Sequence, residues 1–416
     1  MNNKVVSLLV KLYKNKGIQN LSMKSLVKGS FFLFNLYIIN SLSISEVANF
    51  ALFYTTARFF SFFGTDSMHI TYFAEIREMH LGIKENKDIL DRIKTHLLVS
   101  HLLLFGLSIF IFSDFKWIIS VNIVALALSA IRLLSDFSRV NNKIWMSIII
   151  EDVLFTLGFI FFSVIFIRFF DSIVFSVTLA ISICGLLTIL YALSYFKKHL
   201  GINFLTLGKF DFDISRFWFL NRYTIIKGIT VFVLYLSRQF GNHFYGEKMV
   251  AETQLLIIFI NIFTLISTSI VAAFQNEIVL HGNEVLDKKK FLSTYKKLTI
   301  PILYFVFVIC GLLMVFPREF LLMVAPRFAY LEIQFTFAIL LVLLYFLVNP
   351  IFYFFYMNKR VSNFNSIIII DYILLIIIVI SGSIIENYWI WFFALISILV
   401  LNPLQVAING LINLKK

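Results

Sequence analysis

Apolar segments of membrane-spanning length recur along the entire chain. Of its 416 residues, 60% are hydrophobic and 14% are charged, and the mean hydropathy is +0.90. A soluble domain has about 25% charged residues, so this composition excludes a water-soluble globule. A helix needs about 20 apolar residues to cross roughly 30 Å of hydrocarbon. The recurring segments therefore predict an all-α polytopic membrane protein.

Twelve windows have the length and hydropathy of transmembrane helices. They lie near residues 22–42, 46–65, 95–113, 117–137, 144–167, 172–195, 218–240, 252–274, 298–316, 332–356, 364–384 and 387–409. The polar stretches between them are shorter than the roughly 50 residues that a separate domain needs. We therefore expect no catalytic residues and no enzymatic activity. The basic segment before the first window is expected to form a short amphipathic helix on the membrane surface.

The basic residues are distributed unevenly between the predicted loops. The net charge is +13 and the pI is about 9.5, which in a soluble protein would suggest a nucleic-acid partner. With the N-terminus in the cytoplasm, the basic residues of the outer loops are Lys116, Arg168, Arg238, Lys248, Arg318 and Arg327. Nearly all others lie at cytoplasmic ends, as the positive-inside rule requires. We therefore expect both termini in the cytoplasm and no nucleic-acid partner.

The two halves of the chain share a sequence pattern around their fifth predicted helices. The order R-V-x-N followed by S-I-I-I-x-D occurs at residues 139–152 and again at 360–371. The first and seventh predicted helices also share a Lys-Gly step, at Lys28 and Lys227. Each copy would contain six helices, and an even number returns the chain to the side of the membrane on which it began. The two copies would therefore lie parallel, as in transporters that bind substrate between two halves.

This repeat predicts the domain organisation. We expect an N-terminal six-helix lobe at residues 1–200, a cytoplasmic linker at 201–217 and a C-terminal six-helix lobe at 218–416.

Four basic residues lie inside predicted helices, in the half of the bilayer that faces the cytoplasm. They are Lys28, Arg58, Arg132 and Lys227. An intramembrane charge costs about 2.5–3.5 kcal/mol at the bilayer centre, so each is a candidate functional residue. Facing inward, they would form a cationic site for a phosphate-containing headgroup. Snorkelling to the interface is the alternative for Lys28 and Arg132 and, with less weight, for the deeper Arg58. Arg132 could also pair with Asp136, four residues later.

Two acidic residues occupy matching positions of the repeat, Asp152 and Asp371. A buried carboxylate of this kind can bind a coupling proton or sodium ion, or it can pair with a base on a neighbouring helix. We expect no cofactor beyond such a coupling ion. No metal-ligand spacing is present, and Cys184 and Cys310 both lie within apolar runs, which excludes a disulfide scaffold.

Several motifs resemble a known family of exporters. Residues 42–53, LSISEVANFALF, and the following 63–67, FGTDS, resemble the first two helices of polysaccharide exporters in the multidrug/oligosaccharidyl-lipid/polysaccharide (MOP) superfamily. Residues 132–137 resemble the end of the fourth helix of these exporters, and 250–284 the eighth helix with its following loop. Within this superfamily the chain resembles Wzx-type O-antigen flippases in length, number of predicted helices and orientation.

The resemblance implies a substrate and a location. The substrate would be an undecaprenyl-pyrophosphate-linked oligosaccharide, moved from the cytoplasmic to the periplasmic leaflet of the bacterial inner membrane. Membrane lipid and other polysaccharide-assembly proteins are the implied partners. Relatives often have Asp at the outer end of the seventh helix, where this chain has Ser237-Arg238-Gln239, so no ion site is transferred from them.

Two other functions are compatible with a chain of this layout. A multidrug exporter of the same fold would need an acidic site for organic cations, and the excess of intramembrane bases argues against it. An O-antigen polymerase or lipid-dependent glycosyltransferase would need a sizeable outer loop, and the predicted outer loops are short.

Overall fold

The computed structural model describes residues 16–80, 86–141, 143–201, 228–273, 306–357 and 364–413, with a few isolated positions between them. All regular elements in these ranges are helices, which confirms the all-α class. The chain divides into two compact units. Unit 1 comprises Met1–Ala48 and Leu236–Lys416, and unit 2 comprises Asn49–Tyr235. The lobe boundaries expected from the sequence repeat stay a prediction.

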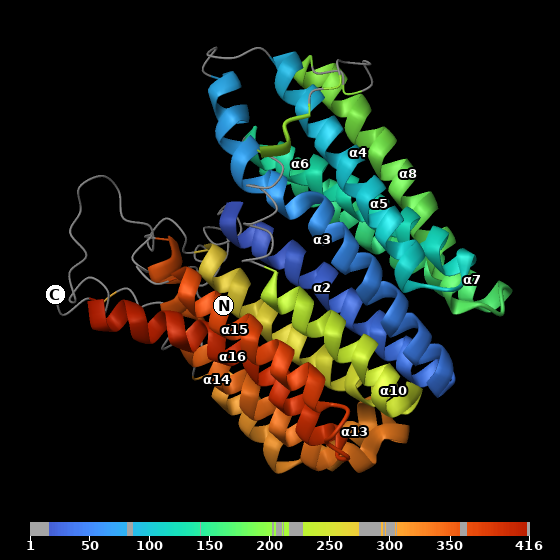
Figure 1. Cartoon of the computed structure of the whole chain (residues 1–416), viewed down its shortest axis with the longest axis vertical. Coiled ribbons are helices and arrows are strands. Elements are labelled where there is room, and N and C mark those ends of the chain that lie inside the picture. The colour runs from blue at the N-terminus through green and yellow to red at the C-terminus, as the bar shows by residue number, and fades with distance from the viewer. Residues whose placement is uncertain are drawn as a thin grey trace, which may run out of the picture. The chain divides into compact units, whose positions relative to one another are not determined.

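Unit 2 contains a set of long helices that pack side by side (Figure 1). Its elements are most of α3 (Ile44–His80), then α4 (Asn86–Ile111), α5 (Phe115–Val140), α6 (Ile144–Ile148), the π-helix η1 (Ile149–Leu157), α7 (Gly158–Phe169) and α8 (Ile173–Leu200). Helix α8 packs against α5 and against α7, and α4 packs against α5.

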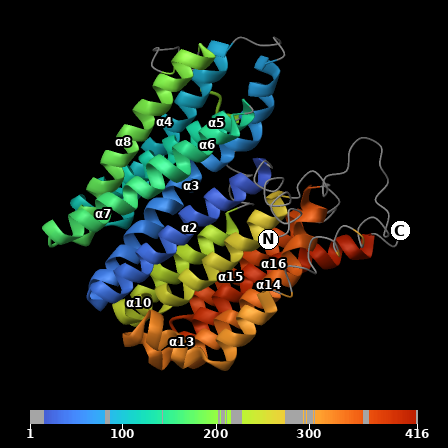
Figure 2. The same ribbon diagram turned by 180° about the vertical axis from the view of Figure 1, so that it is seen from behind.

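Unit 1 is built around the C-terminal helices (Figure 2). Its elements are α2 (Lys16–Ser41), most of α10 (Ile229–Ala273), α13 (Pro317–Val324), the 3-10 helix η2 (Pro326–Leu331), α14 (Glu332–Met357), α15 (Phe364–Ser381) and α16 (Tyr388–Asn413). Helix α16 packs against both α14 and α15, which makes it the centre of this group.

Short polar motifs determine where several helices begin and end. At the start of α3, the Ser43 backbone N–H donates to the Glu46 carboxylate at 2.8 Å, and the Glu46 N–H donates to Ser43 Oγ at 3.3 Å. This reciprocal pair is a capping box. Asp114 caps α5 by accepting from the Lys116 N–H, and Gly201 ends α8 with a φ of 67°. Part of the exporter-like motif at residues 42–53 is therefore a helix-start signal.

Helix α10 consists of two arms that meet at Gly246. This residue has φ 80° and ψ 180°, a backbone conformation that glycine adopts without steric cost. A side-chain hydrogen bond between Arg238 and Gln254, eight residues on either side of the turn, shows that the arms fold back on each other. A Cβ added to Gly241 would lie 2.6 Å from Met249 Sδ, so the arms pack closely.

Six helices of the described residues are long and apolar enough to cross a membrane. They are Asp91–Phe110, Phe115–Arg139, Trp145–Phe169, Ile173–Leu200, Pro326–Asn349 and Tyr388–Asn409. Each coincides with a predicted window, so the chain is a multi-pass membrane protein. Two shorter helices, Val306–Val315 and Pro317–Val324, are separated by a bend of 91°. Taken together as one broken helix, they form a seventh candidate span.

A buried polar cluster connects three helices of unit 2 at Gly64. The His101 Nε2 atom of α4 hydrogen-bonds Ser129 Oγ of α5 at 3.0 Å, and Ser129 Oγ donates to the Ser61 carbonyl of α3 at 3.2 Å. A Cβ at Gly64 would lie 2.6 Å from His101 Nε2 and 2.9 Å from Ser129 Oγ. Glycine is therefore required for the close approach of these helices.

We expect Gly64→Ala to reduce the free energy of unfolding by about 1–3 kcal/mol, because overpacking forces the His101 ring or the helix to move. The matched control is Gly106→Ala, since a Cβ at Gly106 meets no atom within 4 Å. The control should be neutral or slightly stabilising, because alanine is the better helix former. Thermal unfolding in detergent measures both variants, and an equal midpoint for the two would contradict the packing explanation.

Candidate functional site

Unit 1 contains a buried chain of polar side chains that runs from α10 to α2. Arg238 of the first α10 arm donates from Nη2 to Gln254 Oε1 of the second arm. Gln254 Nε2 in turn donates to Asn35 Oδ1 of α2 at 3.4 Å. The exposed fractions of these side chains are 7%, 5% and 5%. Arg238 therefore lies inside the helical unit and not in an outer loop, which corrects the sequence-based placement.

Lys28 lies on the same helix as Asn35 and is half-buried. The seven residues between them correspond to two helical turns, so both side chains lie on one face of α2. Since Asn35 contacts Gln254, this is the face of α2 that packs toward α10.

A second buried group in unit 1 is the carboxylate of Glu252, which is 1% exposed. It accepts hydrogen bonds from the phenols of Tyr330 in η2, at 2.5 Å, and Tyr388 at the start of α16. Lys248, four residues earlier, places its Nζ 3.8 Å from Glu252 Oε1. Three segments of unit 1 are therefore joined through one acidic side chain.

Asp371 on α15 is fully buried, with an exposed fraction of 0%. Its two carboxylate oxygens accept from Asn402 Nδ2 at 2.5 Å and from Gln405 Nε2 at 3.0 Å, both on α16. Within the described ranges no basic side chain forms an ion pair with Asp371. Two neutral carboxamides satisfy the hydrogen bonds of the carboxylate but do not neutralise its negative charge. A cation could therefore still be attracted to it.

In unit 2, Arg58 is exposed on α3, one turn after Tyr54. Tyr54 belongs to an aromatic stack that joins α3 to α7. Its ring centroid lies 5.7 Å from that of Phe50 and 6.1 Å from that of Phe159, with interplanar angles of 10° and 1°. The stack packs this part of α3 against α7, while the side chain of Arg58 is exposed.

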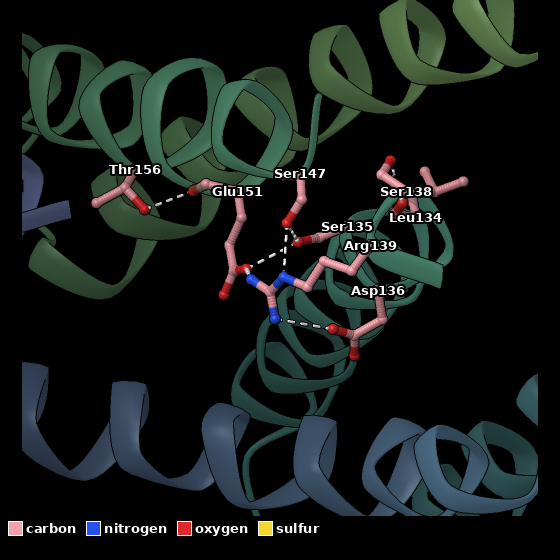
Figure 3. Close-up of polar contacts among 8 residues, drawn as sticks. All are labelled: Leu134, Ser135, Asp136, Ser138, Arg139, Ser147, Glu151 and Thr156. Atoms are coloured by element: carbon pink, nitrogen blue, oxygen red, sulfur yellow. Dashed lines mark hydrogen bonds and ion pairs between the residues drawn. The ribbon is translucent and has the colours of Figure 1, made fainter. Parts of the chain in front are cut away.

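Arg139 lies at the centre of a polar network at the end of α5 (Figure 3). Its Nη1 lies 3.0 Å from Asp136 Oδ1, its Nη2 lies 2.6 Å from Glu151 Oε2, and its Nε donates to Ser147 Oγ at 2.7 Å. Ser135 Oγ also donates to Glu151 Oε2 at 2.8 Å. Each of the three guanidinium nitrogens has a partner on the chain, so Arg139 joins α5 to α6 and η1.

Glu151 lies in an unusual backbone segment. Residues 149–157 form a π-helix, and Thr156 Oγ1 donates to the Glu151 carbonyl oxygen, five residues earlier, at 2.8 Å. A π-helix contains an extra residue relative to an α-helix and is frequent at functional sites. Asp152, the predicted coupling acid, is buried in the same segment with an exposed fraction of 3%.

The predicted basic residues fall in different parts of the structure. Lys28 belongs to unit 1, and Arg58 and Arg132 belong to unit 2, where both side chains are exposed. Lys227 lies outside the described residues. A common cationic cavity formed by these four residues therefore stays a prediction. Among the residues that the structure describes, no three His, Cys, Asp or Glu side chains converge.

Sequence reasoning missed three of the residues that organise these clusters, namely Arg238, Arg139 and Glu252. Arg139 and Arg238 lie close to predicted helix ends, where basic side chains are common because they reach the membrane–water interface. Glu252 lies in an apolar run, VAETQLL, and an isolated acid in such a run was the available signal. Their partners lie on other helices, and no spacing along the chain indicates those contacts.

Comparison with known proteins identifies the fold. The chain is similar to an inward-facing multidrug resistance MATE family transporter of the MOP superfamily, with a TM-score of 0.62, 12% identity and coverage of 96% of this chain and 97% of that one. It is equally similar to the lipid II flippase MurJ in an inward closed conformation, with a TM-score of 0.62, 14% identity and coverage of 95% and 86%. An outward-facing MATE transporter gives a TM-score of 0.55, 15% identity and coverage of 97% and 96%.

These similarities define a class of fold, that of the MOP-type transporters and flippases, and they confirm the MOP-like polytopic architecture expected from the sequence. The solved structures named here are transporters and not enzymes. No family model matches the sequence, and no curated protein matches it. At identities of 12–15% the likeness extends to the fold alone.

We expect Arg139→Met to lower the free energy of unfolding by about 1–3 kcal/mol, because the buried hydroxyl of Ser147 and two carboxylates lose a donor. Arg168→Met is the control, since Arg168 is exposed near the end of α7. Thermal unfolding of the purified protein measures both. An equal loss of stability in the two variants would show that the polar network stabilises the protein no more than an exposed arginine does.

Proposed function

We propose that this protein is a flippase for an undecaprenyl-pyrophosphate-linked oligosaccharide, the repeat unit of O-antigen or a related surface polysaccharide. It would move this lipid from the cytoplasmic to the periplasmic leaflet of the bacterial inner membrane by alternating access, with both termini in the cytoplasm. The polyprenyl tail would stay in the bilayer while the glycan crosses between the helices.

The accessible positive charge on helices of both units carries this proposal. Lys28 is half-buried, and Arg58 and Arg132 are exposed, on helices of a multi-pass membrane protein. Such charges are costly in hydrocarbon and mark substrate pathways. Guanidinium and ammonium groups match phosphate oxygens, so a diphosphate headgroup is the chemistry that these side chains favour. Lys227 is the fourth proposed ligand.

The fold similarities support the same reading. The lipid II flippase MurJ shares the fold over 95% of this chain. The MATE similarity has the same TM-score and would equally suit a multidrug exporter. An exporter of organic cations needs accessible acids. Glu252, Asp152 and Asp371 are buried, and Glu151 is paired with Arg139, whereas Arg58 and Arg132 are exposed bases. Flipping of an anionic lipid is therefore the preferred function.

The direct test uses a strain that lacks this gene. Lipid-linked glycans are extracted after spheroplasts are treated with a membrane-impermeant glycan label. The flippase proposal predicts complete repeat units that the label cannot reach, because they are trapped in the cytoplasmic leaflet. Single repeat units that the label reaches but that never join into chains would instead indicate a polymerase.

Arg58→Ala should reduce flipping at least tenfold while the protein still inserts, because loss of a charge-assisted bond costs about 1.5–3 kcal/mol. Arg58→Lys should retain part of the activity, since the charge persists without the fork geometry. Arg168→Ala serves as the control for loss of one arginine. The leaflet-labelling assay measures all three, and full activity of a stably expressed Arg58→Ala protein would exclude Arg58 from the site.

Asp371 is the proposed coupling residue, for a proton or a sodium ion, and Asp152 is the second candidate. Asp371→Asn keeps the shape of the side chain but removes its charge, so transport should lose its dependence on the ion gradient and fall at least tenfold. Glu319→Gln, at an exposed acid of α13, is the control. Proteoliposomes with imposed proton or sodium gradients provide the measurement. Undiminished gradient dependence in Asp371→Asn would exclude this carboxylate as the coupling group.

A further inference from the structure

Helix α2 comes from the first half of the sequence but packs in unit 1 with helices of the second half. Unit 1 contains Met1–Ala48 together with Leu236–Lys416, whereas Asn49–Tyr235 form unit 2. Alternating access requires two halves to separate on one side of the membrane while they stay in contact on the other. The contacts of α2 within unit 1 therefore join the two predicted halves, and some of them must break during transport.

Two of these contacts lie at different levels of α2. The Phe32 ring lies edge-on to the ring of Phe259 in the second arm of α10, with centroids 5.5 Å apart and an interplanar angle of 71°. At the end of α2, Asn40 Nδ2 donates to the carbonyl oxygen of Val324 at 2.8 Å, and Val324 is the last residue of α13. Both pairs combine a residue of the first half with one of the second half.

A third contact lies between these two, where two carboxamides meet. Gln254 Nε2 donates to Asn35 Oδ1 at 3.4 Å. Each carboxamide is also bonded within its own half, because Asn35 Nδ2 donates to the Phe31 carbonyl and Gln254 Oε1 accepts from Arg238. The two groups are thus oriented to meet whenever the helices come together. The contacts of Phe32, Asn35 and Asn40 together form the α2 seal.

The packing of α2 changes along its length. Four side chains near its C-terminal end, Phe34, Asn35, Ile38 and Ile39, are at most 5% exposed. Beside Lys28, by contrast, a Cβ added to Gly29 would meet no atom within 4 Å. With the N-terminus in the cytoplasm, as proposed, the α2 seal lies toward the periplasm and the space at Gly29 lies toward the cytoplasm.

The α2 seal consists of neutral groups. A hydrogen bond between neutral groups adds little net stability, because water replaces it when the groups separate. Within the second half, by contrast, the Glu252 carboxylate accepts hydrogen bonds from the phenols of Tyr330 and Tyr388. Bonds to a carboxylate are about twice as strong as neutral ones. A force that opens the periplasmic side should therefore separate α2 from α10 and α13 before it disrupts the second half.

We propose that the C-terminal half of α2 is the periplasmic gate of the transport path. The α2 seal holds this gate closed in the structure. In the second conformation α2 moves away from α10 and α13, and the path opens to the periplasm. This inference rests on the alternating access of the proposed flippase function and names the residues that control one of its two conformations.

The first experiment locks the gate with a reversible crosslink. Asn40→Cys and Val324→Cys are combined in a chain that carries Cys184→Ala and Cys310→Ala, and a short bifunctional methanethiosulfonate reagent joins the two thiols. Flipping in the leaflet-labelling assay should fall about tenfold or more, because the open conformation can no longer form. It should return when a reductant cleaves the link, which shows that the crosslinked protein stayed folded.

The matched control places a crosslink within the first half. Phe170 and Phe175 are exposed where α7 meets α8, and their ring centroids lie 5.0 Å apart. Phe170→Cys combined with Phe175→Cys should therefore take up the same reagent without loss of flipping. An Asn40–Val324 crosslink that leaves the flipping rate at the value of the uncrosslinked protein would overturn the gate.

The accessibility of position 35 gives a second readout that requires no lipid substrate. Asn35 is 5% exposed, so Asn35→Cys should react slowly with a membrane-impermeant maleimide added to spheroplasts. Adding Phe32→Ala removes the aromatic contact and should raise the labelling rate roughly 2- to 10-fold, as the gate opens more often. Ala180→Cys, at a position of α8 that is 0% exposed, is the control and should stay unlabelled with and without Phe32→Ala.

The outcomes separate the gate from the flippase proposal. Labelling at position 35 that does not respond to Phe32→Ala, in a protein that flips the lipid normally when crosslinked, overturns the gate and leaves the flippase proposal intact. Labelling that responds as expected, in a protein that flips no lipid-linked glycan, supports the gate and overturns the flippase proposal.

Discussion

Hydrogen bonding of the backbone in a hydrocarbon environment is the constraint on which this structure depends. An unpaired N–H or C=O group in lipid costs several kcal/mol, and a helix satisfies these groups within one segment. The described chain is accordingly helical, and its irregular points, such as the turn at Gly246 and the bend before Pro317, fall where helices end. Where these helices pack against one another, side chains from distant parts of the sequence come into contact. The polar clusters lie at these contacts between helices.

The two buried acids of unit 1, Asp371 and Glu252, differ from the half-buried Glu151 of unit 2 in the groups that they contact. Asp371 is held by two carboxamides of α16, and Glu252 by two phenols with a lysine at its edge. In unit 2, Glu151 is instead paired directly with Arg139. A charged partner cancels a charge and fixes it in place, whereas neutral donors satisfy the oxygen atoms and leave the charge. This difference is why Asp371 is the first candidate in our proposal for a coupling residue.

The shared fold does not by itself determine the substrate. The inward-facing MATE transporter and MurJ have the same TM-score of 0.62, although the first is a multidrug resistance transporter and the second a lipid II flippase. Function belongs to the side chains that a fold carries, and these differ when identity is near 12–15%. The preference for a flippase is our proposal, and it depends on the exposed basic side chains Arg58 and Arg132, since phosphate and organic cations require opposite charges.

The sequence by itself determined the helical class, six of the membrane-spanning segments and the presence of charges within them. These properties depend on composition and on apolar length, which are local and additive. Only the tertiary structure decided that Arg238 is buried against Gln254, which in turn contacts Asn35, and that Arg139 pairs with Glu151. It also decided that Asp152 and Asp371 have different surroundings despite matching positions in the repeat. The physical reason is that the rotation of a helix about its axis, and hence the partner of each polar side chain, depends on packing between segments far apart in the chain.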